Sequence, residues 1–262
     1  MSNIHIADEY KPGKVIAQAS ALFLNNAKPL ERKEIGVDPS LDRNNPSVQY
    51  KKLLEEYTQI HKVSDRMFNG RSLVKFTDII HSFIEKNNCK TLLDYGCGKG
   101  HLYTDEFSTV TDQLDKSLPE VWDLNSYSLF DPGYEEHKEL PREMFDCVIS
   151  TDVLEHVPET DLIWILDEIF SYADKMVFLN IACFKALKTL ADGSNAHISL
   201  FHHLDWLELI SARSEHVKHL VIYIFFDMFD TEGRIELKGF KLSYENNKIR
   251  VIQLHEKEEE QC

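Results

Sequence analysis

A glycine-rich run in the first half of the chain is the clearest candidate for ligand chemistry. Residues 91–100 read TLLDYGCGKG, in which Asp94 precedes Gly96, Gly98 and Gly100 after an apolar segment. Glycine lets the backbone turn sharply at the end of a strand and lets a ligand lie against bare backbone. A helix that follows such a loop has free N–H groups at its start that can bind an anion. The run therefore predicts a nucleotide-like ligand at a strand-to-helix turn.

An acidic residue after the next apolar segment is a second candidate for ligand binding. Asp131 follows SYSLF (126–130) and begins the sequence Asp131-Pro132-Gly133. A carboxylate at the end of a strand can accept hydrogen bonds from both hydroxyl groups of a ribose. The alternative is that Asp131 only starts a turn with Pro132 and Gly133.

A third candidate is the run FDCVISTDVLEHV (145–157), which again passes from apolar residues into polar ones. At the carboxyl end of a parallel strand, Thr151, Asp152 and Val153 would face a ligand bound where the strand order reverses. His156 is a candidate catalytic residue there. Alternatively, Glu155 and His156 could simply open the next helix.

Histidines gather further along the chain, at His197, His202 and His203, with Asp205 beside them. Histidine titrates near neutrality, so we select His197 as the candidate general base, the alternative being a hydrogen-bonded loop histidine. Imidazole and carboxylate groups can bind zinc or iron. The spacing of these four residues matches no standard metal site, so we expect no metal.

Alternating apolar segments predict the scaffold that positions these residues. Helical spacing predicts helices over 47–61, 72–86 and 161–172. Apolar runs rich in β-branched residues predict strands over 91–95, 126–130, 145–151 and 176–182, followed by an antiparallel hairpin of 220–227 and 234–244. Strand, helix, strand at this pitch indicates an α/β fold, a Rossmann-like, doubly wound and mostly parallel sheet with an antiparallel C-terminal hairpin and helices on both faces.

The ends of the chain differ from this central pattern. Residues 1–48 are polar and interrupted by proline and paired asparagines, which predicts an irregular N-terminal arm. We expect the main domain over 49–250, including N-terminal helices, and an acidic C-terminal tail over 251–262. If residues 1–70 fold over the site as a lid, Tyr57 and His61 could reach the ligand.

Composition restricts the partners and the compartment. The chain has 44 acidic and 29 basic residues and a formal net charge of −15, which opposes capture of nucleic acid or of an anionic membrane. The five cysteines include no C-x-x-C pair, and no apolar run approaches the roughly 18–20 residues of a membrane helix. We expect a cytoplasmic protein that acts on a small-molecule partner, with no membrane partner, and the sequence predicts no particular oligomeric state.

Together, the glycine run and the DVLEHV segment resemble the class I S-adenosylmethionine-dependent methyltransferases. The pattern D-x-G-x-G-x-G resembles the family's first motif, and FD-x-V-x-x-x-DVLEHV resembles its fourth strand and the loop that follows. Over 68–206, the features F-x-G-x-S, WILDE and NAH are similar to those of a little-characterised bacterial and phage branch. Where that branch is expected to read PPEWW, this chain reads His202-His203-Leu204-Asp205-Trp206.

This resemblance implies a cofactor and roles for the candidate residues. The cofactor is S-adenosylmethionine, with S-adenosylhomocysteine as product. The expected cofactor-binding residues are Asp94, Tyr95, Gly96, Cys97, Gly98, Asp131, Pro132, Thr151, Asp152 and Val153, and His197 and His156 are the candidate catalytic residues.

The resulting hypothesis is methyl transfer to an oxygen or nitrogen atom of a small molecule. RNA methylation and a noncatalytic S-adenosylmethionine-binding regulatory protein are the alternatives. A nicotinamide dehydrogenase is a weaker one, because His101 stands where the dinucleotide fingerprint needs its third glycine.

Overall fold

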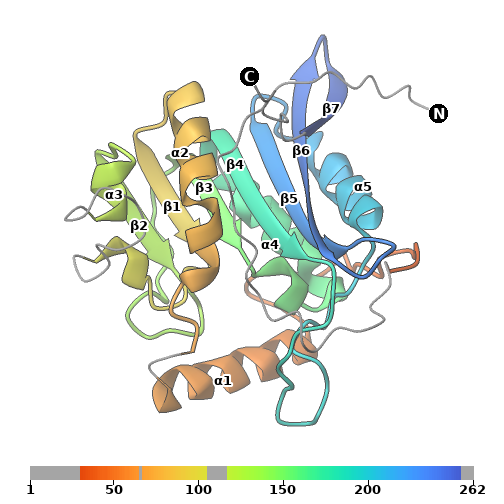
Figure 1. Ribbon diagram of the computed structural model, residues 1–262. Helices are drawn as coiled ribbons and strands as arrows, with labels where there is room; N and C mark the ends of the chain where they lie inside the picture. Colours follow the sequence, from red (N-terminus) through yellow and green to blue (C-terminus); the bar gives the residue numbers. More distant parts are fainter. Residues whose placement is uncertain (1–29, 65–66, 105–116, 255–262) are drawn as a thin grey trace.

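One seven-stranded sheet organises the described part of the chain (Figure 1). The computed structural model describes residues 30–64, 67–104 and 117–254. The strands are β1 Thr91–Tyr95, β2 Ser126–Phe130, β3 Phe145–Thr151, β4 Ala173–Ala182, β5 Val221–Phe229, β6 Ile235–Glu245 and β7 Lys248–Leu254. The α-helices are α1 Val48–Val63, α2 Thr77–Lys86, α3 Leu118–Val121, α4 Leu162–Ser171 and α5 His203–Ser214.

The sheet is parallel over most of its width and antiparallel at one side. Its strand order is β2-β1-β3-β4-β5-β6-β7, with parallel pairing from β2 through β5 and antiparallel pairing of β5 with β6 and β6 with β7. Because β2 and β3 lie on opposite sides of β1, the strand order reverses at β1. The predicted mostly parallel sheet and C-terminal hairpin are confirmed.

Helices cover both faces of the sheet, as predicted. Phe83 of α2 packs on one face against Phe178 of β4 and Tyr223 of β5. The other face packs against α4 and α5, where Leu166 and Trp206 are completely buried. Strands covered on both sides have near-continuous apolar runs, which explains residues 147–149 of β3 and 176–179 of β4.

Several element boundaries differ from the sequence prediction. The expected helix over 72–86 is a 3-10 helix, Arg71–Phe76, followed by α2, and no helix was predicted over α5. Only a 3-10 turn, His101–Tyr103, follows the glycine run among the described residues, so the expected helix start is absent there.

The C-terminal tail was placed too early. Residues 251–254 belong to β7, which pairs with β6 in an antiparallel hairpin. Asn246 and Asn247 both take positive φ values (51° and 60°) and form the tight turn that joins the two strands. The rest of the expected tail, 255–262, lies outside the described residues, as do 1–29 of the arm.

The described part of the arm, residues 30–47, has no helix, and its apolar side chains pack against the core. Ser47 then starts α1, since its side chain accepts a hydrogen bond from the Tyr50 N–H at 3.0 Å. In Figure 1, α1 lies across the ends toward which the parallel strands point. Within the described ranges, no helix combines the length and the apolar character needed to cross a membrane.

Candidate functional site

A cavity of about 750 Å³ opens where the parallel strands end. The loops after β1, β2 and β3 line it together with α1 and the segment after β4. The strand order reverses at β1, and ligands of open α/β sheets bind in the crevice at such a reversal. The position of the cavity is therefore the one that the topology favours for a ligand.

The glycine loop after β1 packs closely against two other segments. Gly96 and Gly98 have φ values of +87° and +59°. A Cβ atom on Gly96 would lie 2.3 Å from a methyl carbon of Val153, and one on Gly98 would lie 2.2 Å from the backbone oxygen of Phe68. Both positions require glycine because of conformation and space.

The N–H groups of this loop are already hydrogen bonded within the protein. Gly96 and Cys97 donate to the Phe130 carbonyl oxygen, and Gly98 donates to the Asp131 carboxylate at 2.9 Å. Lys99 donates to the Phe68 carbonyl oxygen at 2.7 Å. The sequence predicted free N–H groups at the start of a helix after the loop, where the described residues form only a 3-10 turn. The N–H groups of residues 96–99 are also occupied, so the loop is not built like a phosphate cradle.

Asp131 lines the cavity and also holds its walls together. One of its oxygen atoms accepts from Gly98 and the other from the Gly133 N–H, each at 2.9 Å. The turn-forming alternative from the sequence therefore describes part of its role. Each carboxylate oxygen can accept a second hydrogen bond, so the ribose role remains available. Burial raises the pKa of Asp131. The imidazole of His61, 3.8 Å away, counteracts part of this rise.

Asp94 takes a different position from the other predicted cofactor residues. It is buried at the end of β1 and is not among the residues that line the cavity, whereas Tyr95, Gly96, Cys97 and Gly98 are. Burial raises the pKa of Asp94 to about 7, and the Tyr103 hydroxyl offsets part of the rise. Asp94 can therefore act on a ligand only through the loop.

Thr151 ends β3, and Asp152 and Val153 follow it. All three line the cavity, as does Pro132 beside Asp131. Asp152 has a φ of +60°, which is uncommon for a residue other than glycine. Its side chain is 44% exposed, and one oxygen lies 4.0 Å from Nε2 of His197.

Both candidate catalytic histidines also line the cavity, although they come from different segments. Their rings meet edge to face, with centroids 4.8 Å apart. His156 Nδ1 lies 2.9 Å from the Tyr57 hydroxyl and 2.9 Å from the Ala196 carbonyl oxygen. Burial lowers the pKa of His156 to about 4, so its ring is neutral at pH 7.

The structure adds lining residues from outside the sequence motifs. Helix α1 contributes six side chains, including Tyr57 and His61, the two residues expected to reach the site if the N-terminal region covers it. Phe184 and 186–190 also line the cavity, and no pattern in the sequence marked them. Phe68 and Gly70, from the F-x-G-x-S feature, pack against the glycine loop.

His202 and His203, the other histidines of the sequence group, lie apart from His197. Asp205 forms an ion pair with Arg32 and accepts from the Lys33 N–H, whereas His203 packs near Phe226 and Phe240. The group of four residues considered from the sequence as a metal site is therefore not assembled.

A family model described as a methyltransferase domain matches residues 68–221, which is more than half of the chain. The match covers the glycine loop, Asp131, the segment after β3 and His197, whereas α1 precedes it. No curated protein matches the sequence.

Proposed function

Because this chain belongs to the methyltransferase domain family, within the class I superfamily, we propose that it transfers a methyl group from S-adenosylmethionine to an oxygen or nitrogen atom of a small molecule. One observation carries the proposal. The glycine loop, Asp131 and the segment after β3 line a single cavity at the point where the strand order reverses.

The residues present fit this cofactor. Gly96 and Gly98 allow the loop to pack against Val153 and the Phe68 backbone with positive φ values, and in this conformation the loop lines the cavity. The hydrogen-bonded N–H groups of the loop disfavour a ligand held by its phosphates, such as NAD. Asp131 supplies a carboxylate for ribose hydroxyl groups.

Each part of the site has a separate task. When bound, S-adenosylmethionine supplies an electrophilic methyl group, so the protein needs mainly to orient the acceptor. Gly96, Gly98 and Asp131 hold the cofactor, and Thr151, Asp152 and Val153 lie at the boundary with the acceptor. His197 and His156 lie on the acceptor side, where His197 is the candidate to receive a proton.

The size of the cavity and the helix beside it favour a small acceptor. Helix α1 contributes Leu53, Tyr57 and His61 to its lining, and pockets for small molecules span about 300–1,000 Å³. The net charge of −15 opposes a polynucleotide.

Calorimetry with S-adenosylmethionine, S-adenosylhomocysteine and NAD tests the cofactor. We expect the first two to bind and NAD not to bind. Transfer of a tritiated methyl group into a metabolite extract then tests turnover. Cofactor binding without transfer to any fraction would favour a noncatalytic protein. Binding and methylation of tRNA at physiological salt would contradict the small acceptor.

A further inference from the structure

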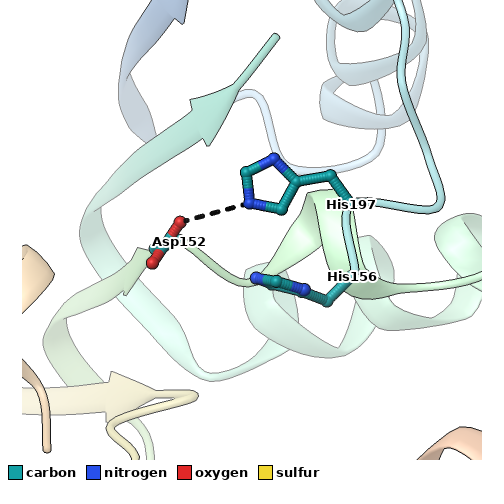
Figure 2. Close-up of side chains that lie close together, drawn as sticks. All are labelled: Asp152, His156 and His197. Carbon is teal, nitrogen blue, oxygen red and sulfur yellow. Dashed lines mark ion pairs between the residues drawn. The ribbon is translucent and has the colours of Figure 1, made fainter. Parts of the chain in front are cut away.

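Three side chains of metal-binding type converge on the acceptor side of the cavity. Figure 2 shows the rings of His156 and His197 close together, with Asp152 facing them. One potential ligand atom from each residue lies within 4.8 Å of the other two. Asp152 and His156 follow β3, and His197 belongs to the segment after β4.

Hydrogen bonds to the backbone determine which nitrogen of each ring is free. Nδ1 of His156 lies 2.9 Å from the Ala196 carbonyl oxygen, and Nδ1 of His197 lies 2.6 Å from that of Phe184. A carbonyl oxygen can only accept, so Nδ1 carries the proton in both rings, and the Tyr57 hydroxyl oxygen, also 2.9 Å from Nδ1 of His156, accepts from the same N–H. Nε2 of each neutral ring then has a free lone pair. Metal-binding histidines are oriented in this way by a backbone carbonyl.

The three groups are therefore all acceptors. The Asp152 carboxylate lies 4.0 Å from Nε2 of His197, too far for a hydrogen bond. Two imidazole lone pairs and a carboxylate that face one another form a ligand set that a divalent cation can bind.

We propose that Asp152, His156 and His197 bind one divalent cation, and that this ion binds a hydroxyl group of the acceptor. Mixed nitrogen and oxygen ligands suit Mn²⁺, Co²⁺ or Zn²⁺, and three protein ligands leave coordination positions open on the cavity side. The second half of the proposal rests on the proposed function. It narrows the acceptor to molecules with a hydroxyl group.

This site changes two expectations from the sequence. The sequence predicted no metal, because His197 is distant in the chain from Asp152 and His156. His197 was the candidate base, but here its lone pair binds the ion. The ion lowers the pKa of the bound hydroxyl, whose proton leaves to water.

Calorimetry of the full chain without a histidine tag tests the ion site, with Mn²⁺, Co²⁺ and Zn²⁺ as separate probes. We expect one ion per chain and a Co²⁺ absorption band typical of nitrogen and oxygen ligands. Asp152→Asn and His197→Gln should each weaken binding about tenfold or more. His202→Gln is the matched control, because His202 lies near Asp205 and away from the proposed ion site. This variant should bind the ions like the wild type.

Absence of stoichiometric binding by all three ions would overturn the proposal. So would equal binding by the wild type, Asp152→Asn and His197→Gln, after circular dichroism has shown that the variants are folded. Binding of S-adenosylhomocysteine by the wild type in EDTA separates the two proposals. If it binds while the ions do not, only the ion site fails. Ion binding without S-adenosylhomocysteine binding would instead contradict the methyltransferase proposal.

Discussion

Because Gly98 has no side chain, the glycine loop can pack directly against the backbone at Phe68. The residue has a positive φ, and the Phe68 backbone occupies the place of a Cβ atom, 2.2 Å away. Neither the strain nor the contact can be relieved by a side-chain rotation. Backbone has to move, and with it the loop that carries Cys97 and the hydrogen bond to Asp131.

Gly98→Ala should therefore weaken S-adenosylhomocysteine binding about tenfold or more, because left-handed strain of roughly 1–2 kcal/mol adds to the contact with Phe68. Gly193→Ala is the control. Gly193 has a φ of +82° with no atom within 4 Å of the Cβ position, so it tests the strain alone. Calorimetry compares the two. Equal affinity in both variants would contradict the role of close packing.

At Asp131, the proposed role in ligand binding can be tested separately from the role in forming the turn. Asp131→Asn removes one charged acceptor while it keeps the shape, and lost hydrogen bonds to charged groups cost about 1.5–3 kcal/mol. We expect the affinity for S-adenosylhomocysteine to fall by about tenfold or more. Asp230→Asn changes a similar turn, in which Asp230 accepts from the Glu232 and Arg234 N–H groups. Titration of both variants should show a loss at Asp131 only.

At the scale of elements, ion pairs help to attach the arm to the core, one of them between Arg32 and Asp205 of α5. Arg43 pairs with Glu168 of α4, and Glu168 accepts from the Tyr95 hydroxyl at 2.6 Å. The Glu168 side chain is 14% exposed and the Arg43 side chain 36% exposed. This contact links residues 30–47 to α4 and β1, and residues 30–47 lead directly into α1.

Arg43→Met should lower the free energy of unfolding by about 2 kcal/mol, because loss of one partner leaves a mostly buried carboxylate unpaired. Arg213→Met is the control, because Arg213 of α5 pairs with another carboxylate of α4. It removes the pair with Asp167, whose side chain is 43% exposed, and should cost less than about 1 kcal/mol. Urea unfolding gives both values. A loss at Arg213 as large as that at Arg43 would contradict the argument from burial.

At the scale of the whole molecule, stability should depend on a histidine outside the cavity. His203 is buried near Phe226 and Phe240, with His202, Lys238, Arg32 and Asp205 near enough to influence it. Burial lowers the pKa of His203 from its ordinary value of 6.5 to about 4. Between these values the unfolded chain binds the proton and the folded chain does not, so acid favours unfolding.

The stability that depends on neutral His203 is complete above about pH 6.5 and decreases as the pH falls toward 4. We expect a loss of up to about 2 kcal/mol between pH 8 and pH 5 relative to His203→Phe. His219 is exposed, so His219→Gln should keep the wild-type slope. Urea unfolding at both pH values measures the difference. Parallel curves for the wild type and His203→Phe would contradict the prediction.

Local pattern in the sequence determined most of the scaffold and the part of the cavity formed by the glycine loop, Asp131 and the end of β3. Apolar periodicity predicted β1 to β6, α1 and α4, because it reflects which residues face the core. The glycine spacing, Asp131 and Thr151 to Val153 were predicted to lie together, because parallel strands end at the same edge of a sheet. Periodicity did not predict β7, whose face is only partly buried, or α5.

Only the tertiary structure decided which distant side chains meet. Tyr57 and His156 are 99 positions apart in the chain, and His156 and Ala196 are 40 apart, yet hydrogen bonds join them. No local pattern encodes such contacts, because they depend on how α1 crosses the strand ends and how the segment after β4 returns to the cavity. For the same reason the histidines looked like one group in the sequence. The fold instead separates His203 from His197 and brings His197 to His156 and Asp152.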